Sequence, residues 1–140
     1  MPPEEIVIAD SSPLIGLARI GMLPLLPKLA RRIVVPPAVR LEITEAKHEA
    51  PGAKDVADQF WIETFTPDPA IVAPLRILVG LGEAEAIALA QREPASVLLL
   101  DDLRARRLAA RLNLRRMGTV ALLAAAKRAG FIDRLKPQLE

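Results

Sequence analysis

The sequence predicts a three-layer α/β/α domain built around a central, mostly parallel sheet. Short runs of apolar residues, of the length of buried strands, recur along the chain. Segments with helical patterns separate these runs, which is the arrangement that gives parallel strands covered by helices on both faces. No repeat, low-complexity tract or linker interrupts the 140 residues, so we expect one domain over residues 1–140.

The first apolar run, residues 6–9, is followed by Asp10, Ser11, Ser12 and Pro13. Ser and Pro are typical first residues of a helix, so we expect a strand, a Ser cap and a helix through about residue 20. The further elements expected in this half are a helix over 22–30, a strand over 33–35, a helix over 37–49, a short helix over 53–60 and a strand over 61–65.

An apolar segment over residues 69–79, which ends at Gly80, opens the second half as an expected helix. Gly82 and Glu83 begin another helix through residue 90. The apolar run 97–100 is an expected buried strand that ends on Asp101 and Asp102. Helices over 103–112 and 119–129 complete the chain, with a short strand at Met117 between them.

Composition excludes several classes of protein. The chain has no cysteine, which excludes disulfides, a thiolate nucleophile and a Cys-ligated zinc site. No apolar run approaches the roughly 18 residues of a membrane span. The N-terminal Met-Pro-Pro-Glu-Glu is acidic where a secretory signal is basic. We therefore expect a cytoplasmic protein without a membrane partner.

Charge is distributed unevenly along the chain. Residues 1–100 carry 9 basic and 13 acidic side chains, a net charge of −4, whereas residues 101–140 carry 10 basic and 4 acidic, a net charge of +6. Such asymmetry indicates either an anionic partner or a solvated helix face. Arg104, Arg107 and Arg111 recur at helical spacing just after Asp101. They share one helix face, which suits phosphate binding by RNA and equally suits salt bridges within the fold.

Four acids lie at the expected ends of strands or on the helices beside them. Asp10 and Asp101 each follow a strand, Glu42 lies on the helix after the second strand, and Glu83 lies in a first helical turn. Ligands of open parallel sheets gather at the carboxyl ends of the strands. Four oxygen donors without sulfur suit Mg²⁺ or Mn²⁺, which can activate water and stabilise charge on a phosphodiester. Each acid alone is equally explained as a helix cap.

The order of these motifs resembles that of PIN domains, over residues 6 to about 136. Five segments carry the resemblance: Asp10–Ile15, Pro36–Val39 with Glu42, Gly82–Ile87, Leu99–Asp102 with Arg106–Ala109, and Gly118–Thr119 before a Leu/Ala helix with Lys127 and Gly130. They are similar to a PIN branch catalogued as a domain of unknown function and to the VapC-type toxins of toxin–antitoxin pairs.

The resemblance implies a divalent-metal-dependent endoribonuclease that hydrolyses single-stranded RNA. Asp10, Glu42, Glu83 and Asp101 match the four acids of the family, with Asp10, Asp101 and Glu83 as the metal ligands. Glu85 is an alternative to Glu83, although residues two positions apart on a helix face different ways. Glu stands where other PIN domains have Asp at the third acid, which lengthens its reach by one methylene. Asp102 is an alternative to Asp101 or assists it, and accessory roles fall to Ser11, Ser12, Asp102 and Thr119. The resemblance also implies a cognate antitoxin and a homodimer, for which the 69–79 helix is a candidate interface.

Several residues are expected to have structural and not catalytic roles. His48, the only histidine, has a polar context typical of a surface residue, and Gly80-Leu-Gly82 lacks the pattern of a phosphate loop. Phe60, Trp61 and Phe65 are expected in the core or a dimer interface, with base stacking as the minority interpretation. Two other functions remain open, a catalytically silent PIN-fold binding module and a phospho-receiver-like signalling domain. The second fits poorly, because a receiver needs its acidic pair after the first strand.

Overall fold

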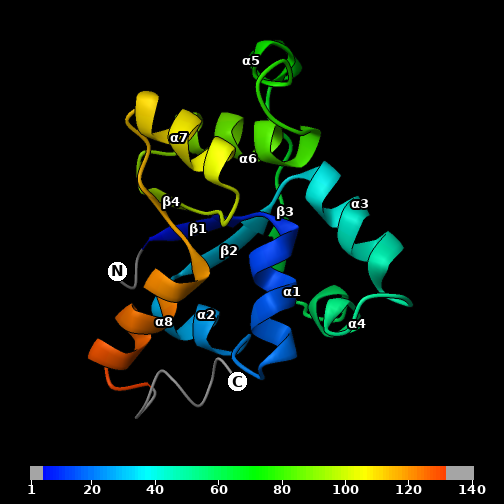
Figure 1. Cartoon of the computed structure of the whole chain (residues 1–140), viewed down its shortest axis with the longest axis vertical. Helices are drawn as coiled ribbons and strands as arrows, with labels where there is room; N and C mark the ends of the chain where they lie inside the picture. The colour runs from blue at the N-terminus through cyan, green and yellow to red at the C-terminus, as the bar shows by residue number, and fades with distance from the viewer. Residues whose placement is uncertain (1–4, 132–140) are drawn as a thin grey trace.

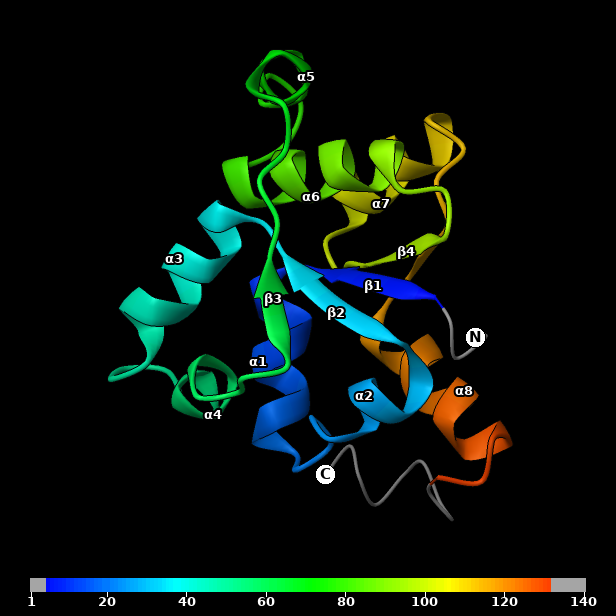
Figure 2. The ribbon, with the colours of Figure 1, turned by 180° about the vertical axis from the view of Figure 1, so that it is seen from behind.

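The computed structural model describes residues 5–131, and its centre is a five-stranded sheet in which every neighbouring pair of strands is parallel. The strand order is β3-β2-β1-β4-β5, with β1 in the middle (Figures 1 and 2). The strands are β1 (Ile6–Ala9), β2 (Arg32–Val35), β3 (Ile62–Thr64), β4 (Ser96–Leu99) and β5 (Arg116–Met117). The predicted α/β class with a parallel sheet is confirmed.

Helices cover both faces of this sheet. Alternate side chains of β1 point to opposite faces, so Val7 and Ala9 join one buried cluster and Ile6 and Ile8 join the other. The first cluster is completed by α1 (Ser11–Arg19), α2 (Leu25–Leu29), α3 (Pro37–Ala46), α4 (Ala53–Ala57) and α8 (Thr119–Arg128). The second is completed by α5 (Pro69–Leu75), α6 (Leu81–Arg92) and α7 (Leu103–Arg111). Within residues 5–131, no helix is long and apolar enough to cross a membrane.

Three expected helices differ from those observed, each for a local reason. The Ser cap of the first helix is wrong, because Asp10 is the N-cap and accepts a hydrogen bond from the Ser11 backbone N–H. The expected helix 22–30 is reduced to α2, which begins only after Pro24. The expected helix 69–79 ends at Leu75, with Pro74 inside it and Arg76 as its C-cap. Beyond the cap, the backbone N–H groups of Ile77 and Leu78 bond three residues back, as in turns. The chain from residue 76 to 79 forms turns instead.

The three neighbouring aromatic residues do not share one environment. Phe60 is 93% exposed, so the prediction of a core position is wrong for it. Trp61 is half-buried against the first cluster, and Phe65 is half-buried against the second. The short strand β3 that follows Trp61 contributes only Ile62 to the first cluster. Phe60 lies in the turn before this strand and packs against neither cluster.

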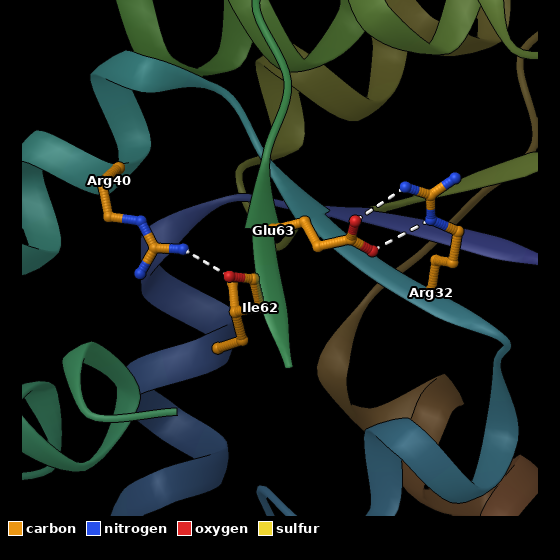
Figure 3. A network of polar contacts seen from close by, with 4 residues as sticks. All are labelled: Arg32, Arg40, Ile62 and Glu63. Carbon is orange, nitrogen blue, oxygen red and sulfur yellow. Dashed lines mark hydrogen bonds and ion pairs between the residues drawn. The ribbon is translucent and has the colours of Figure 1, made fainter. Parts of the chain in front are cut away.

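Polar contacts tie the edge strand β3 to its neighbours (Figure 3). Arg40 of α3 donates a hydrogen bond of 2.7 Å to the carbonyl oxygen of Ile62 and one of 3.1 Å to Thr64 Oγ1. Arg32 of β2 forms a two-point ion pair with Glu63, with contacts of 2.9 and 2.7 Å. Because α3 also carries Glu42, the Arg40 contacts help to fix the position of that acid relative to the sheet.

Candidate metal centre and adjoining groove

The carboxyl ends of β1 and β4 form the edge of the sheet where the predicted acids gather. These two strands are adjacent and in register from Ile6 to Ala9. After β1 the chain builds β2 and β3 on one side, and it then returns to build β4 and β5 on the other. The boundary between β1 and β4 is therefore the topological switch point, where open α/β sheets bind their ligands. Asp10 directly follows β1, and Asp101 and Asp102 follow Leu100 beyond β4.

Asp10 is the buried member of the acidic group. Its side chain is 8% exposed, and its Oδ1 atom accepts a hydrogen bond of 2.8 Å from the Ser11 backbone N–H. The pKa of Asp10 is raised to about 6, chiefly by burial and also by the negative charges of Glu83, Glu42 and Asp102, while the Ser11 hydrogen bond lowers it. The Asp10 carboxylate is thus buried close to the negative charges of three other acids.

Glu42 reaches the same space from α3. Its Oε2 atom accepts a hydrogen bond of 2.7 Å from Ser11 Oγ. A methyl group added to Gly82 of α6 would lie 2.6 Å from Glu42 Oε1 and 3.6 Å from Asp10 Oδ1. The two carboxylate oxygens therefore face one small space above Gly82, which exists because residue 82 has no side chain.

Glu83 and Glu85 are separated by their direction, as their spacing on one helix requires. Glu83 is half-buried, and burial raises its pKa, as does the charge of Asp102; a hydrogen bond from the Gly80 backbone opposes the rise. Glu85 instead accepts a hydrogen bond of 2.7 Å from the backbone N–H of Ala38 at the start of α3. Glu83 is therefore the α6 acid that lies with Asp10 and Asp102.

Asp101 and Asp102 serve different elements although they are adjacent in sequence. Both carboxylate oxygens of Asp101 are used by Thr119, whose backbone N–H lies at 2.8 Å and whose hydroxyl lies at 2.6 Å. Asp102 caps α7 through a hydrogen bond of 2.9 Å from the Ala105 backbone N–H. Its charge raises the pKa of both Asp10 and Glu83. The structure thus brings Asp102 to the other acids and turns Asp101 and Thr119 toward each other.

The donor set fits a magnesium-like ion that retains part of its water shell. Within the described residues, no three Asp, Glu or His side chains converge closely enough to hold an ion by themselves. Mg²⁺ does not require this, because it is commonly held by one or two carboxylates, several waters and a substrate phosphate. Asp10 and Glu42 offer two oxygens to one space, and Glu83 and Asp102 add negative charge beside it. Among residues 5–131, none of these four acids has an ion pair.

A groove of about 820 Å³ adjoins the acids. Glu83 and Asp102 line it where α7 begins, and the exposed Arg104, Arg107 and Arg111 line it along that helix. The structure therefore places the three predicted arginines in one groove with two of the acids. No ion pair or hydrogen bond engages their side chains in the part of the chain that the structure describes. The remaining lining comes mainly from apolar residues, which are Ile77, Leu78, Val79, Leu103 and Leu108.

Comparison with protein-family models gives a match over residues 6–140, to a family described as a PIN domain. The chain belongs to the PIN-domain family. PIN domains are generally nucleases and typically use divalent metals, which agrees with the chemistry of the acids found here. Because the chain belongs to this family, it is not a phospho-receiver-like signalling domain. No curated protein gives a significant sequence match to the chain.

Two features of this PIN domain were missed in the sequence. The first is the close approach of Glu42 and Asp10 to Gly82, which the sequence predicts only as the start of a helix and of a PIN-like segment. The second is the exposed apolar side of the groove at Ile77 and Leu78. The sequence predicts a regular helix there, whereas α5 ends at Leu75 and a turn presents these residues.

Proposed function

We propose that this PIN domain is a divalent-metal-dependent endoribonuclease that hydrolyses single-stranded RNA. The observation that carries the proposal is a group of carboxylates beside a groove lined by three arginines. Within residues 5–131, neither these carboxylates nor these arginines form an ion pair. Like charges held together in this way are unfavourable in the protein alone. A divalent cation and a phosphate together neutralise both halves of the arrangement, which is the charge pattern of a metal-bound phosphodiester.

The residues have distinct roles in this proposal. Asp10 and Glu42 would hold Mg²⁺ or Mn²⁺, and Glu83 and Asp102 add negative charge beside the ion. The bound ion would supply an activated water and neutralise charge on the phosphate. Ser11 orients Glu42 through its hydroxyl. Arg104, Arg107 and Arg111 bind the phosphates that lead to the acids. Asp101 was predicted as the fourth acid, but the Thr119 contacts favour Asp102 in that role.

The experiment that tests the nuclease is cleavage of a single-stranded RNA with Mn²⁺, with Mg²⁺ and with EDTA. We expect cleavage only with a divalent metal. Asp10→Asn should reduce it on the order of 100-fold or more, as the loss of one strong electrostatic contact to a transition state does. Asp55→Asn, an exposed acid on α4, is the matched control and should cleave as wild type. Undiminished cleavage by pure protein in EDTA would falsify the metal site.

The biological role that we propose is that of a toxin neutralised by a cognate antitoxin, acting as a homodimer. This part depends on the resemblance to VapC-type toxins and on the nuclease chemistry. Induced expression of wild-type protein should arrest growth, and Asp10→Asn should not. The alternative of a catalytically silent binding module predicts RNA binding without metal-dependent cleavage, so the same assay separates the two functions.

A further inference from the structure

The groove beside the acids has an apolar side as well as an arginine side. Ile77 is 84% exposed and Leu78 is 47% exposed, both in the turn that follows α5. Leu103, which is 58% exposed, lines the same groove next to Asp102. Exposed aliphatic side chains gathered in one concave surface indicate a ligand that has an apolar face.

The composition of the groove identifies the chemical class of that ligand. The arginines require an anion, and the aliphatic side requires a flat or apolar group within reach of the same groove. An unpaired nucleotide carries both, since its phosphate is anionic and its base presents an apolar face. A duplex presents phosphates on its outside and stacks its bases on each other, so it would contact the arginines and leave Ile77 and Leu78 uncovered.

We propose that Ile77 and Leu78 form a base-contacting wall, and that this wall selects RNA that is unpaired next to the scissile phosphate. This inference rests on the proposed function, because the acids and arginines fix where the phosphates lie. Glu83 and Asp102 line the groove where α7 begins, so the phosphate neutralised by metal lies at that end. The bases of the following nucleotides then lie within reach of Ile77 and Leu78, which line the same groove.

The test compares binding of a short single-stranded oligoribonucleotide with binding of the same strand annealed to its complement. Fluorescence anisotropy on an Asp10→Asn background, in which we expect no cleavage, gives the two dissociation constants. Adding Ile77→Ala and Leu78→Ala together should weaken binding of the single strand about tenfold, the scale of losing one apolar contact. Binding of the duplex and the salt dependence should not change.

Two further variants serve as controls. Ile71 of α5 is 41% exposed but lies outside the groove lining, so Ile71→Ala should bind both RNAs as its parent does. Arg107→Ala should weaken single-stranded and duplex binding alike and lower the salt slope by about 1, because it removes a phosphate contact. Unchanged melting temperatures would show that the variants fold.

The outcomes distinguish the wall from the nuclease. If the double alanine variant binds single-stranded RNA as tightly as its parent, or loses duplex binding equally, the wall is wrong while metal-dependent cleavage by wild type can still hold. If the same substitutions instead convert a dimer to a monomer in light scattering, with RNA binding unchanged, the wall is a contact between copies and the proposal fails. Selective loss of single-strand binding with no metal-dependent cleavage by wild type would keep the wall and reject the nuclease.

Discussion

Glu63 and Asp10 are both carboxylates of the parallel sheet, yet their surroundings are opposite. Glu63 on β3 receives two hydrogen bonds from Arg32 (Figure 3). The Arg32 guanidinium also lies 4.8 Å from the centre of the Phe65 ring. The Arg32 contact lowers the pKa of Glu63. Asp10 at the end of β1 is buried among other acids, and its pKa is raised to about 6. The fold thus places a cation beside Glu63, whereas Asp10 forms no ion pair within residues 5–131.

This difference shows which acid is structural and which is reserved for a ligand. A carboxylate with a lowered pKa stabilises the fold in its charged form, and that contribution is lost as pH falls through the folded pKa. A carboxylate with a raised pKa favours the folded state only while it is protonated, and that contribution is lost as pH rises through the folded pKa. Asp10 therefore costs stability at neutral pH unless a cation binds, which is the behaviour of a metal ligand.

The largest expected effect is on the stability of the metal-free protein. Between the unfolded pKa of 3.8 and the folded value of about 6, wild type should lose stability as pH rises. Asp10→Asn keeps a capping oxygen for Ser11 and removes the charge, so it should stabilise the metal-free protein at pH 7 by up to about 3 kcal/mol. Urea unfolding in EDTA at pH 4, 5, 6 and 7 measures this difference.

Glu63→Gln should change stability in the opposite direction, because it breaks the pair with Arg32. The loss is small, since both side chains are partly exposed. Mn²⁺ should raise the melting temperature of Glu63→Gln as much as that of wild type, and should not raise that of Asp10→Asn. Destabilisation of the metal-free protein by Asp10→Asn would show that the charge of Asp10 stabilises the fold, as an acid at a helix N-terminus does, and that Asp10 is not reserved for a metal.

The next effect concerns the space that Glu42 and Asp10 share. Gly82→Ala would place a methyl group 2.6 Å from Glu42 Oε1 and 3.2 Å from Val39 Cγ2, so Glu42 must move away. We expect Mn²⁺ affinity to fall about tenfold, the size of effect seen when the support of a metal ligand is altered. The stability cost is offset by the helix preference for Ala over Gly, about 0.5–1 kcal/mol. Titration of the melting temperature with Mn²⁺ gives the affinity.

Gly16 provides the matched control for Gly82. It lies within α1, and a methyl group there would meet nothing within 4 Å. Gly16→Ala should therefore stabilise the protein by about 0.5–1 kcal/mol and leave Mn²⁺ affinity unchanged. Equal metal affinity in the Gly16 and Gly82 variants would mean that Glu42 does not need its present position.

A smaller effect separates the two adjacent aspartates. Asp101→Ala removes the acceptor of two hydrogen bonds from Thr119, so we expect a loss of about 1–2 kcal/mol in the free energy of unfolding. Its Mn²⁺-induced rise in melting temperature should remain. Asp102→Asn keeps a capping oxygen for Ala105 and removes a charge beside Asp10, so its Mn²⁺-induced rise should shrink. The reverse pattern would restore Asp101 as the fourth acid.

The sequence predicted most of this site, because a parallel sheet gathers the carboxyl ends of its strands. Asp10 follows a four-residue apolar run that has the length of a buried strand, and Glu83 opens a helix that packs on that strand. The choice between Asp101 and Asp102 could not be made in this way. Both residues follow Leu100, and which of them lies with the other acids depends on the turn into α7, where Asp102 is the N-cap and Asp101 bonds Thr119.

The groove could not be predicted from the sequence pattern of any single segment. Residues 69–79 are apolar at helical spacing, so a helix to Gly80 was the natural expectation. α5 instead ends at Leu75, and the turn that follows it presents Ile77 to solvent. Whether an apolar segment is covered depends on the elements that pack against it, and these are set by the tertiary fold and not by the segment.

The smallest expected effect tests how α3 is held so that Glu42 can reach Asp10. Pro36 and Pro37 at the start of α3 have no N–H and give no side-chain cap, so the first free donor is the Ala38 N–H. Glu85 of α6 accepts from it at 2.7 Å and thereby caps one helix from another. Glu85→Ala should cost about 0.5–1 kcal/mol and weaken Mn²⁺ binding a few-fold, because Glu42 is carried by the loosened helix.

Glu85→Gln separates this cap from a direct electrostatic role. Its side-chain oxygen can still accept the Ala38 hydrogen bond, so both stability and Mn²⁺ affinity should return nearly to wild type, short of the few tenths of a kcal/mol that a negative charge adds near a helix N-terminus. Urea unfolding and Mn²⁺ titration of the two variants measure both quantities. If Gln weakens metal binding as much as Ala does, the charge of Glu85 acts on the ion directly, and the difference between Glu83 and Glu85 inferred from their direction is wrong.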